Sequence, residues 1–270
     1  MPPGRARMSP RKRARYSRVV QYGVLVVIVV AVVMGTDWSN MREQVFNLEA
    51  VQKMASDVPY AFVNTVKYTA SAFAVALALG LVLALMKLSS VRLYRIVATG
   101  YVEFFRGVPA LLVVLAFAYI VPVAFQVRFS SVTVTIALAL GMVSAAYLAE
   151  TLRAGLQAVP KGQVEAARSL GMTSGQTMRS VVIPQAFRMV LPPVTNEIVL
   201  LTKDTSLIYV MGLAVPDYDL TRLARYTLNN VAVGGLTAFV VVGIAYLMIT
   251  IPLSALTRWL ERKTGSKGHV

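Results

Sequence analysis

The chain has 270 residues, of which 57% are hydrophobic and only 14% are charged, and its formal net charge is +15. A soluble domain carries charges at about a quarter of its positions, so this composition indicates an integral membrane protein. Cysteine is absent, which excludes disulfides, thiolate catalysis and thiolate metal sites. The single histidine, His269, is expected to be a solvated residue near the C-terminus, and we expect no metal site or cofactor in this chain.

Six segments are apolar enough to cross a membrane, which takes about 20 largely apolar residues. They predict an all-α fold, a polytopic membrane bundle of six transmembrane helices. The predicted spans are residues 19–35, 62–86, 108–127, 132–148, 190–215 and 236–256.

Basic residues lie beside alternate spans, which predicts the orientation by the positive-inside rule. The connection 36–60 is the more acidic one and is expected outside, whereas the basic loop 153–180 and the basic tail 263–270 are expected inside. We therefore predict a cytoplasmic N-terminus and a cytoplasmic C-terminus. The first span is interpreted as a retained anchor, with a cleavable signal peptide as the alternative. The N-terminal basic residues are Arg5, Arg7, Arg11, Lys12, Arg13, Arg15 and Arg18.

The loop 155–184 is polar, lies between two apolar segments, and has the pattern of a docking element. Residues 164–170 predict a short helix that carries the small residues Ala166 and Ala167 beside charged Glu165 and Arg168. Gly171 permits the turn out of this helix, and a second helical run over 176–182 leads to Pro184. A short helix with a small-residue face and flanking charges suits a groove on another protein.

The loop resembles the EAA signature of ABC-importer permeases. The resemblance rests on Glu165-Ala166-Ala167, Gly171, and Val181-x-Ile183-Pro184, with Val and Ile where the pattern usually has Ile and Leu. In that family the element is the coupling helix, which inserts into the ATPase subunit. The resemblance therefore implies that ATPase coupling depends on Glu165, Ala166, Ala167, Arg168 and Gly171.

Further segments resemble the polar amino-acid branch of the same family. They imply a permease domain over 58–262 and a cytoplasmic tail over 263–270. Members commonly have five spans, so residues 1–57, read as a basic cytoplasmic N-terminus, an anchor helix and an external connection, depart from the pattern. The matching segments are Asn64-Thr65-Val66-Lys67-Tyr68-Thr69, Glu103-Phe104-Phe105-Arg106-Gly107-Val108-Pro109, Tyr147-Leu148-Ala149-Glu150, Arg153-Ala154-Gly155 and Lys203-Asp204-Thr205-Ser206-Leu207.

The resemblance implies the permease subunit of an ATP-driven importer for polar amino acids, of the glutamate and glutamine type or related, in a bacterial plasma membrane. The chain has no phosphate-binding GxxxxGK[ST] loop, so it is expected not to be an enzyme, with ATP and Mg bound by a partner ATPase. The implied partners are an ABC ATPase dimer, a second permease copy or a related permease, an external solute-binding protein, the substrate and membrane lipid, with no nucleic acid.

Three other functions remain open. The solute could be an amino-acid-like compatible solute such as ectoine. The chain could instead be an ion-coupled secondary carrier that uses Glu197 or Asp204 as its proton site. It could also be a non-transporting scaffold that recruits an ATPase.

The remaining charged and polar residues divide into two groups. Glu103 and Arg106 lie three apart, as do Glu150 and Arg153, so each pair predicts a local ion pair, or else a brace for the coupling loop. In the fifth span, charges near the membrane centre are costly in lipid and must face protein or water. At 100° per residue, Glu197 and Asp204 fall on a face expected to meet a partner helix; the alternative is that all these groups hold a permease dimer together. The stripe predicted to line the substrate pathway is Thr195, Asn196, Thr202, Lys203 and Ser206.

Overall fold

The computed structural model describes residues 10–214, 216–231 and 233–264. Every regular element in those ranges is a helix. Arg5, Arg7 and His269 lie outside the described residues, as does most of the predicted tail 263–270 and position 215 at the end of the fifth predicted span.

Four helices are long and apolar enough to cross a membrane. They are Arg11–Gly35 within α1 (Pro10–Gly35), α4 (Val58–Leu88), α8 (Val132–Gln157) and α13 (Thr237–Thr264). A fifth span results if the bent pair of α5 (Arg92–Gly107) and Ala110–Phe125 is counted as one. The predicted count of six and the orientation of the ends therefore stay predictions.

The third predicted span differs from the structure because of a sharp bend. α5 turns by 102° into a short arm made of α6 (Ala110–Leu115), the π-helical η1 (Ala116–Ile120) and α7 (Val121–Phe125). Val108 precedes Pro109 and adopts an extended conformation (φ −90°, ψ 132°), as a residue before proline prefers. The bend leaves too few residues after it for a span on their own.

The fifth predicted span is also shifted. The helix α11 (Ile183–Asp204) begins seven residues before the predicted segment and continues into the 3₁₀-helical η3 (Thr205–Met211). Pro192 and Pro193 lie inside α11 and do not end it. Because α11 contains many polar residues, it is not among the four helices that are apolar enough to cross a membrane.

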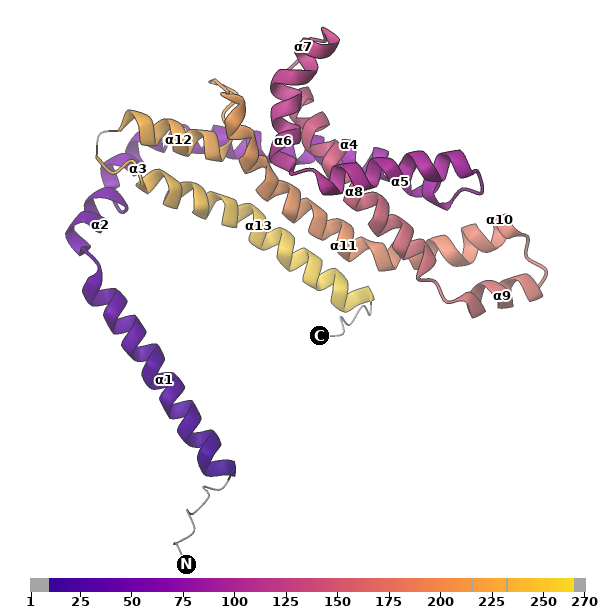
Figure 1. Cartoon of the computed structure of the whole chain (residues 1–270), viewed down its shortest axis with the longest axis horizontal. Helices are drawn as coiled ribbons and strands as arrows, with labels where there is room; N and C mark the ends of the chain where they lie inside the picture. Colours follow the sequence, from indigo (N-terminus) through magenta and orange to yellow (C-terminus); the bar gives the residue numbers. More distant parts are fainter. Residues whose placement is uncertain (1–9, 215, 232, 265–270) are drawn as a thin grey trace, which may run out of the picture.

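The centre of the bundle is the long packed pair of α4 and α8 (Figure 1). Glycines allow close approach between these two helices. A Cβ added at Gly80 would lie 2.9 Å from Leu148 Cβ, and one added at Gly141 would lie 2.8 Å from Val75 Cβ. Neither glycine can be enlarged unless α4 and α8 move apart.

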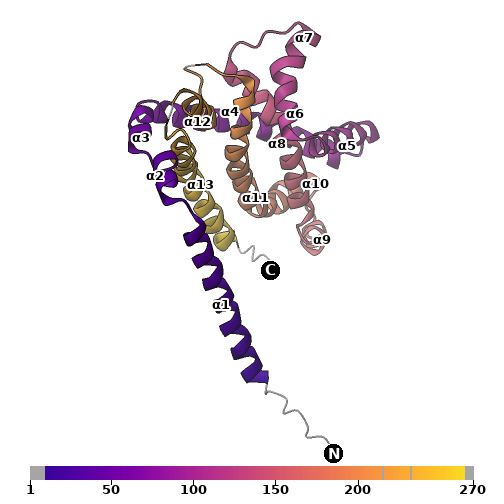
Figure 2. The same cartoon turned by 60° about the vertical axis from the view of Figure 1, so that its left-hand side comes forward.

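The N-terminal segment meets the bundle at one corner only. α1 extends away from it (Figures 1 and 2), and none of its apolar window is buried. The next helices, α2 (Trp38–Gln44) and α3 (Leu48–Met54), dock where α12 (Leu220–Asn230) turns into α13. Asn47 N donates to Thr237 Oγ1 at 3.0 Å, and Ala50 and Met54 are buried. Gly234, at φ +80°, has no room for a Cβ beside Asn47.

Candidate functional site

The predicted docking helix is present as α9 (Lys161–Ser169), three residues earlier at its start than the sequence predicted. Its C-terminal end is a Schellman motif. Gly171 N donates to Arg168 O at 3.0 Å, and Met172 N donates to Ala167 O at 3.2 Å. Gly171 has φ +83°, a conformation that glycine adopts without steric cost. Gly171 therefore ends the helix as its position in the sequence predicted.

The outer surface of α9 is open. Glu165, Ala166 and Arg168 are exposed, whereas Ala167 is buried beneath them. Leu170 is 85% exposed, an unusual position for a large apolar side chain. A concavity of about 390 Å³ lies beside the helix, and its lining includes Ala166, Leu170 and Val181. This surface has the chemistry of a docking element: small and apolar at its centre, charged at its edge.

The loop is fastened to the bundle from behind. The segment after α9 consists of α10 (Ser174–Thr177), capped by Thr173 and Gln176, and the π-helical η2 (Met178–Val182), which leads into α11. Gln185 Nε2 donates to Gln163 Oε1 at 3.1 Å, joining the start of α11 to α9. Val159, Val182 and Ala186 form a small core between the loop and the helices. α9 is therefore held by both α8 and α11.

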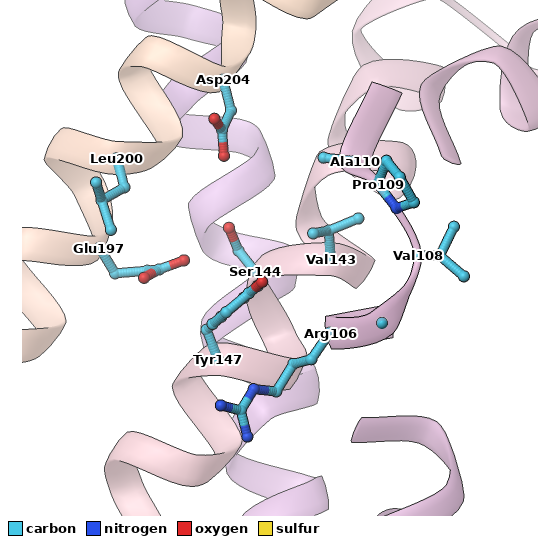
Figure 3. Close-up of a pocket in the computed structure, with 11 residues that line it drawn as sticks. Arg106, Val108, Pro109, Ala110, Val143, Ser144, Tyr147, Glu197, Leu200 and Asp204 are labelled. Atoms are coloured by element: carbon cyan, nitrogen blue, oxygen red, sulfur yellow. The ribbon is translucent and has the colours of Figure 1, made fainter. Parts of the chain in front are cut away.

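A cavity of about 490 Å³ lies between the bend after α5, the middle of α8, and α11. Arg106 lies at the end of α5, Ser144 and Tyr147 lie on α8, and Glu197 and Asp204 lie on α11 (Figure 3). The two carboxylates point into the same space because a seven-residue spacing returns to one face of a helix after two turns. The lining of the cavity thus includes one arginine and two acidic residues.

Arg106 does not form the local ion pair that its spacing from Glu103 predicted. Its guanidinium lies 5.7 Å from the centre of the Tyr147 ring, and Arg106 is one of the residues that line the cavity. Both Arg106 and Glu103 are exposed. The bend at Pro109 explains the difference, since it opens the cavity beside the last turn of α5. The other predicted pair is present: Arg153 Nη2 lies 2.8 Å from Glu150 Oε2.

The predicted pathway stripe is divided between different environments. Thr195 and Thr202 are buried, and each hydroxyl donates to a carbonyl of its own helix at 2.8 Å. Asn196 and Lys203 are exposed on a face of α11 that nothing in the described chain covers, and Ser206 is half-buried in η3. None of the five lines the cavity. The stripe stays a prediction for an assembly larger than one chain.

Sequence reasoning missed Ser144 and Tyr147 as cavity residues. Tyr147 belongs to a segment that matches the family, together with Glu150. Helical periodicity also placed Glu197 and Asp204 on one face of their helix. No sequence signal indicated that the face of α8 carrying Ser144 meets that face of α11. Among the described residues, no group of three or more His, Cys, Asp or Glu could hold a metal ion.

Comparison with known proteins gives consistent matches. Residues 76–266 match the family described as binding-protein-dependent transport system inner membrane component. The glutamate/aspartate import permease protein GltK of Escherichia coli O157:H7 is 35% identical over 212 residues, covering 75% of this chain and 91% of that protein. The arginine transport system permease protein ArtQ of Bacillus subtilis is 34% identical over 205 residues, covering 75% of this chain and 90% of ArtQ.

A solved structure extends the likeness to three dimensions. It is described as the crystal structure of an amino acid ABC transporter with histidines. The TM-score is 0.72 at 34% identity, covering 79% of this chain and 96% of that one.

Fold, docking loop and matches together define a multi-pass inner-membrane transport subunit rather than an enzyme. The chain belongs to the family of binding-protein-dependent transport system inner membrane components. The extra segment that includes α1–α3 precedes the matched residues 76–266.

Proposed function

We propose that this chain is the permease subunit of an ATP-driven importer of polar amino acids, and that the cavity beside Arg106 receives the solute. The observation that carries the proposal is that one arginine and two acidic residues line one cavity of about 490 Å³. An amino acid has an ammonium group and a carboxylate, which Glu197 or Asp204 and Arg106 respectively would bind. The names of GltK and ArtQ support this substrate class.

The charge of the cavity narrows the substrate further. A bound zwitterionic amino acid would pair its carboxylate with Arg106 and its ammonium group with one of the two acidic residues, so the other acidic residue of the cavity would stay unpaired. An acidic side chain placed beside that remaining carboxylate would be repelled, and such repulsion is strong where water is scarce. We therefore propose that this cavity binds neutral or basic polar amino acids in preference to glutamate and aspartate, which differs from the acidic solutes in the name of the relative GltK.

A second permease copy, or a related permease, would complete the pathway. The exposed face of α11 carries Pro193, Asn196 and Lys203. A bare lysine in lipid is costly. A facing chain would enclose Asn196 and Lys203 in a polar channel. This assigns the predicted stripe partly to the interface between two permeases, within a transmembrane domain that we place at 58–262.

The docking surface of α9 would bind an ABC ATPase subunit, which supplies the site for ATP and Mg. Glu165, Ala166, Ala167, Arg168 and Gly171 are the proposed coupling residues. An external binding protein would deliver the solute, and closure of the ATPases would move α9 and change which side of the membrane the cavity faces. A ligand shifts such an equilibrium only through different affinities for its two states.

The test uses the permease reconstituted in proteoliposomes with its ATPase and binding protein. Arg106→Gln and Glu197→Gln should each reduce uptake of a labelled amino acid while assembly is retained. Glu103→Gln is the matched control, because Glu103 lies three residues from Arg106 and is also exposed, but lies outside the cavity. Normal uptake in both cavity variants would refute the assignment of the cavity.

The same vesicles separate the alternatives. Uptake driven by a proton gradient without the ATPase would indicate the secondary carrier, with Glu197 or Asp204 as its proton site. Competition by ectoine, another zwitterion, at lower concentration than any amino acid would indicate a compatible-solute importer.

A further inference from the structure

Three charged side chains meet where α4 and α8 end beside the coupling loop. The Lys87 ammonium, in the last turn of α4, contacts Glu150 Oε1 on α8. Arg153 donates to the other carboxylate oxygen, Glu150 Oε2, from Nε at 2.9 Å and from Nη2 at 2.8 Å. The third Arg153 nitrogen, Nη1, donates to Gln157 Oε1 at 2.6 Å. The Glu150 carboxylate therefore joins α4 to α8, and Arg153 extends the cluster to Gln157, the last residue of α8.

This cluster differs from an ordinary surface ion pair. Lys87 and Glu150 are 63 residues apart in the sequence, and their side chains are 12% and 21% exposed. By contrast, Glu49 and Lys53 pair within one helix, with side chains 73% and 57% exposed. Solvent-exposed pairs contribute little because water and salt screen them, whereas the contact between Lys87 and Glu150 is largely sheltered from both.

The cluster lies next to the elements that hold the coupling helix. Two residues after Arg153, Gly155 packs against α11 so closely that an added Cβ would overlap Val190 Cγ1. The last two turns of α8 are thus held on one side by α4, through Glu150, and on another by α11, through Gly155. Gln157 ends α8, and α9 begins four residues later.

The opposite end of α4 makes a second set of polar contacts. Asn64 Nδ2 donates to Pro216 O at 2.7 Å and to Tyr218 O at 3.0 Å, and Tyr68 OH donates to Asp217 O at 3.0 Å. These carbonyls belong to the segment between η3 and α12, at the far end of the bundle from α9 (Figure 1). A 31-residue helix is about 46 Å long, so α4 connects the coupling loop to the segment 216–218 at the opposite end of the bundle.

We propose that Lys87 is a positioning residue that makes α4 move with the coupling helix, so that movement of the ATPase is transmitted to the segment 216–218 at the opposite end of the bundle. This inference rests on the proposed coupling role of α9. The ion pair adds to the close packing at Gly80 and Gly141 in holding the axial register of α4 on α8, since a slide of one helical turn, about 5.4 Å, would separate Lys87 from Glu150. Without the ion pair, the end of α4 beside the coupling loop can shift relative to α8 when the ATPase moves α9.

The test measures solute molecules imported per ATP hydrolysed by the full complex in proteoliposomes. Lys87→Met should lower this ratio about fivefold or more, in the usual range of coupling between distant sites. Lys87→Arg keeps the cation and should restore most of the ratio. Lys53→Met, which breaks the exposed pair on α3, is the matched control and should leave the ratio unchanged.

A variant at the far end of α4 tests the transmission separately. Tyr68→Phe removes one hydroxyl and no volume, so folding is retained even if Lys87→Met proves unstable. It should lower the same ratio, and Lys87→Met combined with Tyr68→Phe should lose less than the product of the single effects, because both interrupt one route.

An unchanged ratio in Lys87→Met or in Tyr68→Phe would overturn the proposal, and so would a loss confined to the yield of assembled complex. Failure of the proposed function is distinguishable, because the unmodified complex would then show no ATP-dependent uptake at all.

Discussion

Replacing Gly171 by valine should uncouple ATP hydrolysis from uptake, with a size set by the backbone alone. No atom lies within 4 Å of a Cβ added there, so the substitution creates no clash. The cost comes from φ +83°, which disfavours an L-residue by about 1–2 kcal/mol, and a β-branched one at the upper end. That cost changes the population of the Schellman end by about 5–30-fold, so α9 loses its defined C-terminus where it would meet the ATPase.

Gly175→Val is the matched control for this experiment. Gly175 lies in the same loop on α10, also has no atom within 4 Å of an added Cβ, does not have a positive φ, and is outside the concavity beside α9. The assay is binding-protein-stimulated ATP hydrolysis and uptake in proteoliposomes, normalised to assembled permease. Gly171→Val should lose several-fold of both, whereas Gly175→Val should retain them. Equal behaviour of the two variants would refute the argument that the left-handed residue shapes the docking end.

Three further predictions follow from the same structure. Burial raises the pKa of Asp219 from 3.8 to about 6. The folded chain should therefore lose up to about 3 kcal/mol of stability as pH rises from about 4 to 6. Asp219→Asn should reduce the dependence of the melting temperature on pH, measured in detergent between pH 4.5 and 7.5. The same pH dependence in the variant and the unmodified chain would contradict this. Glu165→Lys should reduce stimulated ATP hydrolysis, because it reverses an exposed charge on the docking surface; normal stimulation would count against that surface. Deleting residues 1–57 should reduce the yield of assembled complex more than uptake per complex, since α2 and α3 support the α12–α13 corner; a fully assembled but inactive truncation would show the opposite.

Several features could be predicted from sequence because they depend on neighbouring residues. Continuous apolar runs predicted the helices α1, α4, α8 and α13, since backbone groups in lipid must be satisfied within the segment. Gly171 was predicted to end a helix because the left-handed turn is a property of one residue and its neighbours. The bend after α5 was less accessible: the segment that ends in Pro109 was recognised as a match to the family, but the sequence did not indicate a 102° change of direction.

The cavity and the α4–α8 cluster could not be predicted in the same way. Helical periodicity places Glu197 and Asp204 on one face, but it does not say which neighbour that face meets. The structure places Arg106 and Tyr147 beside them, and it joins Lys87 to Glu150 across 63 residues. The docking of Asn47 beside Gly234 and Thr237 is likewise a contact between distant segments.

The amino-acid sequence by itself determined that this chain is a helical membrane protein with a polar docking loop, because hydropathy, basic flanks and turn residues act locally. Only the tertiary structure decided which charged groups share a cavity and which helices are braced together. The physical reason is that packing of small residues such as Gly80, Gly141 and Gly155 sets how closely and in which register the helices meet. That register decides which of the charged groups on each helix come into contact.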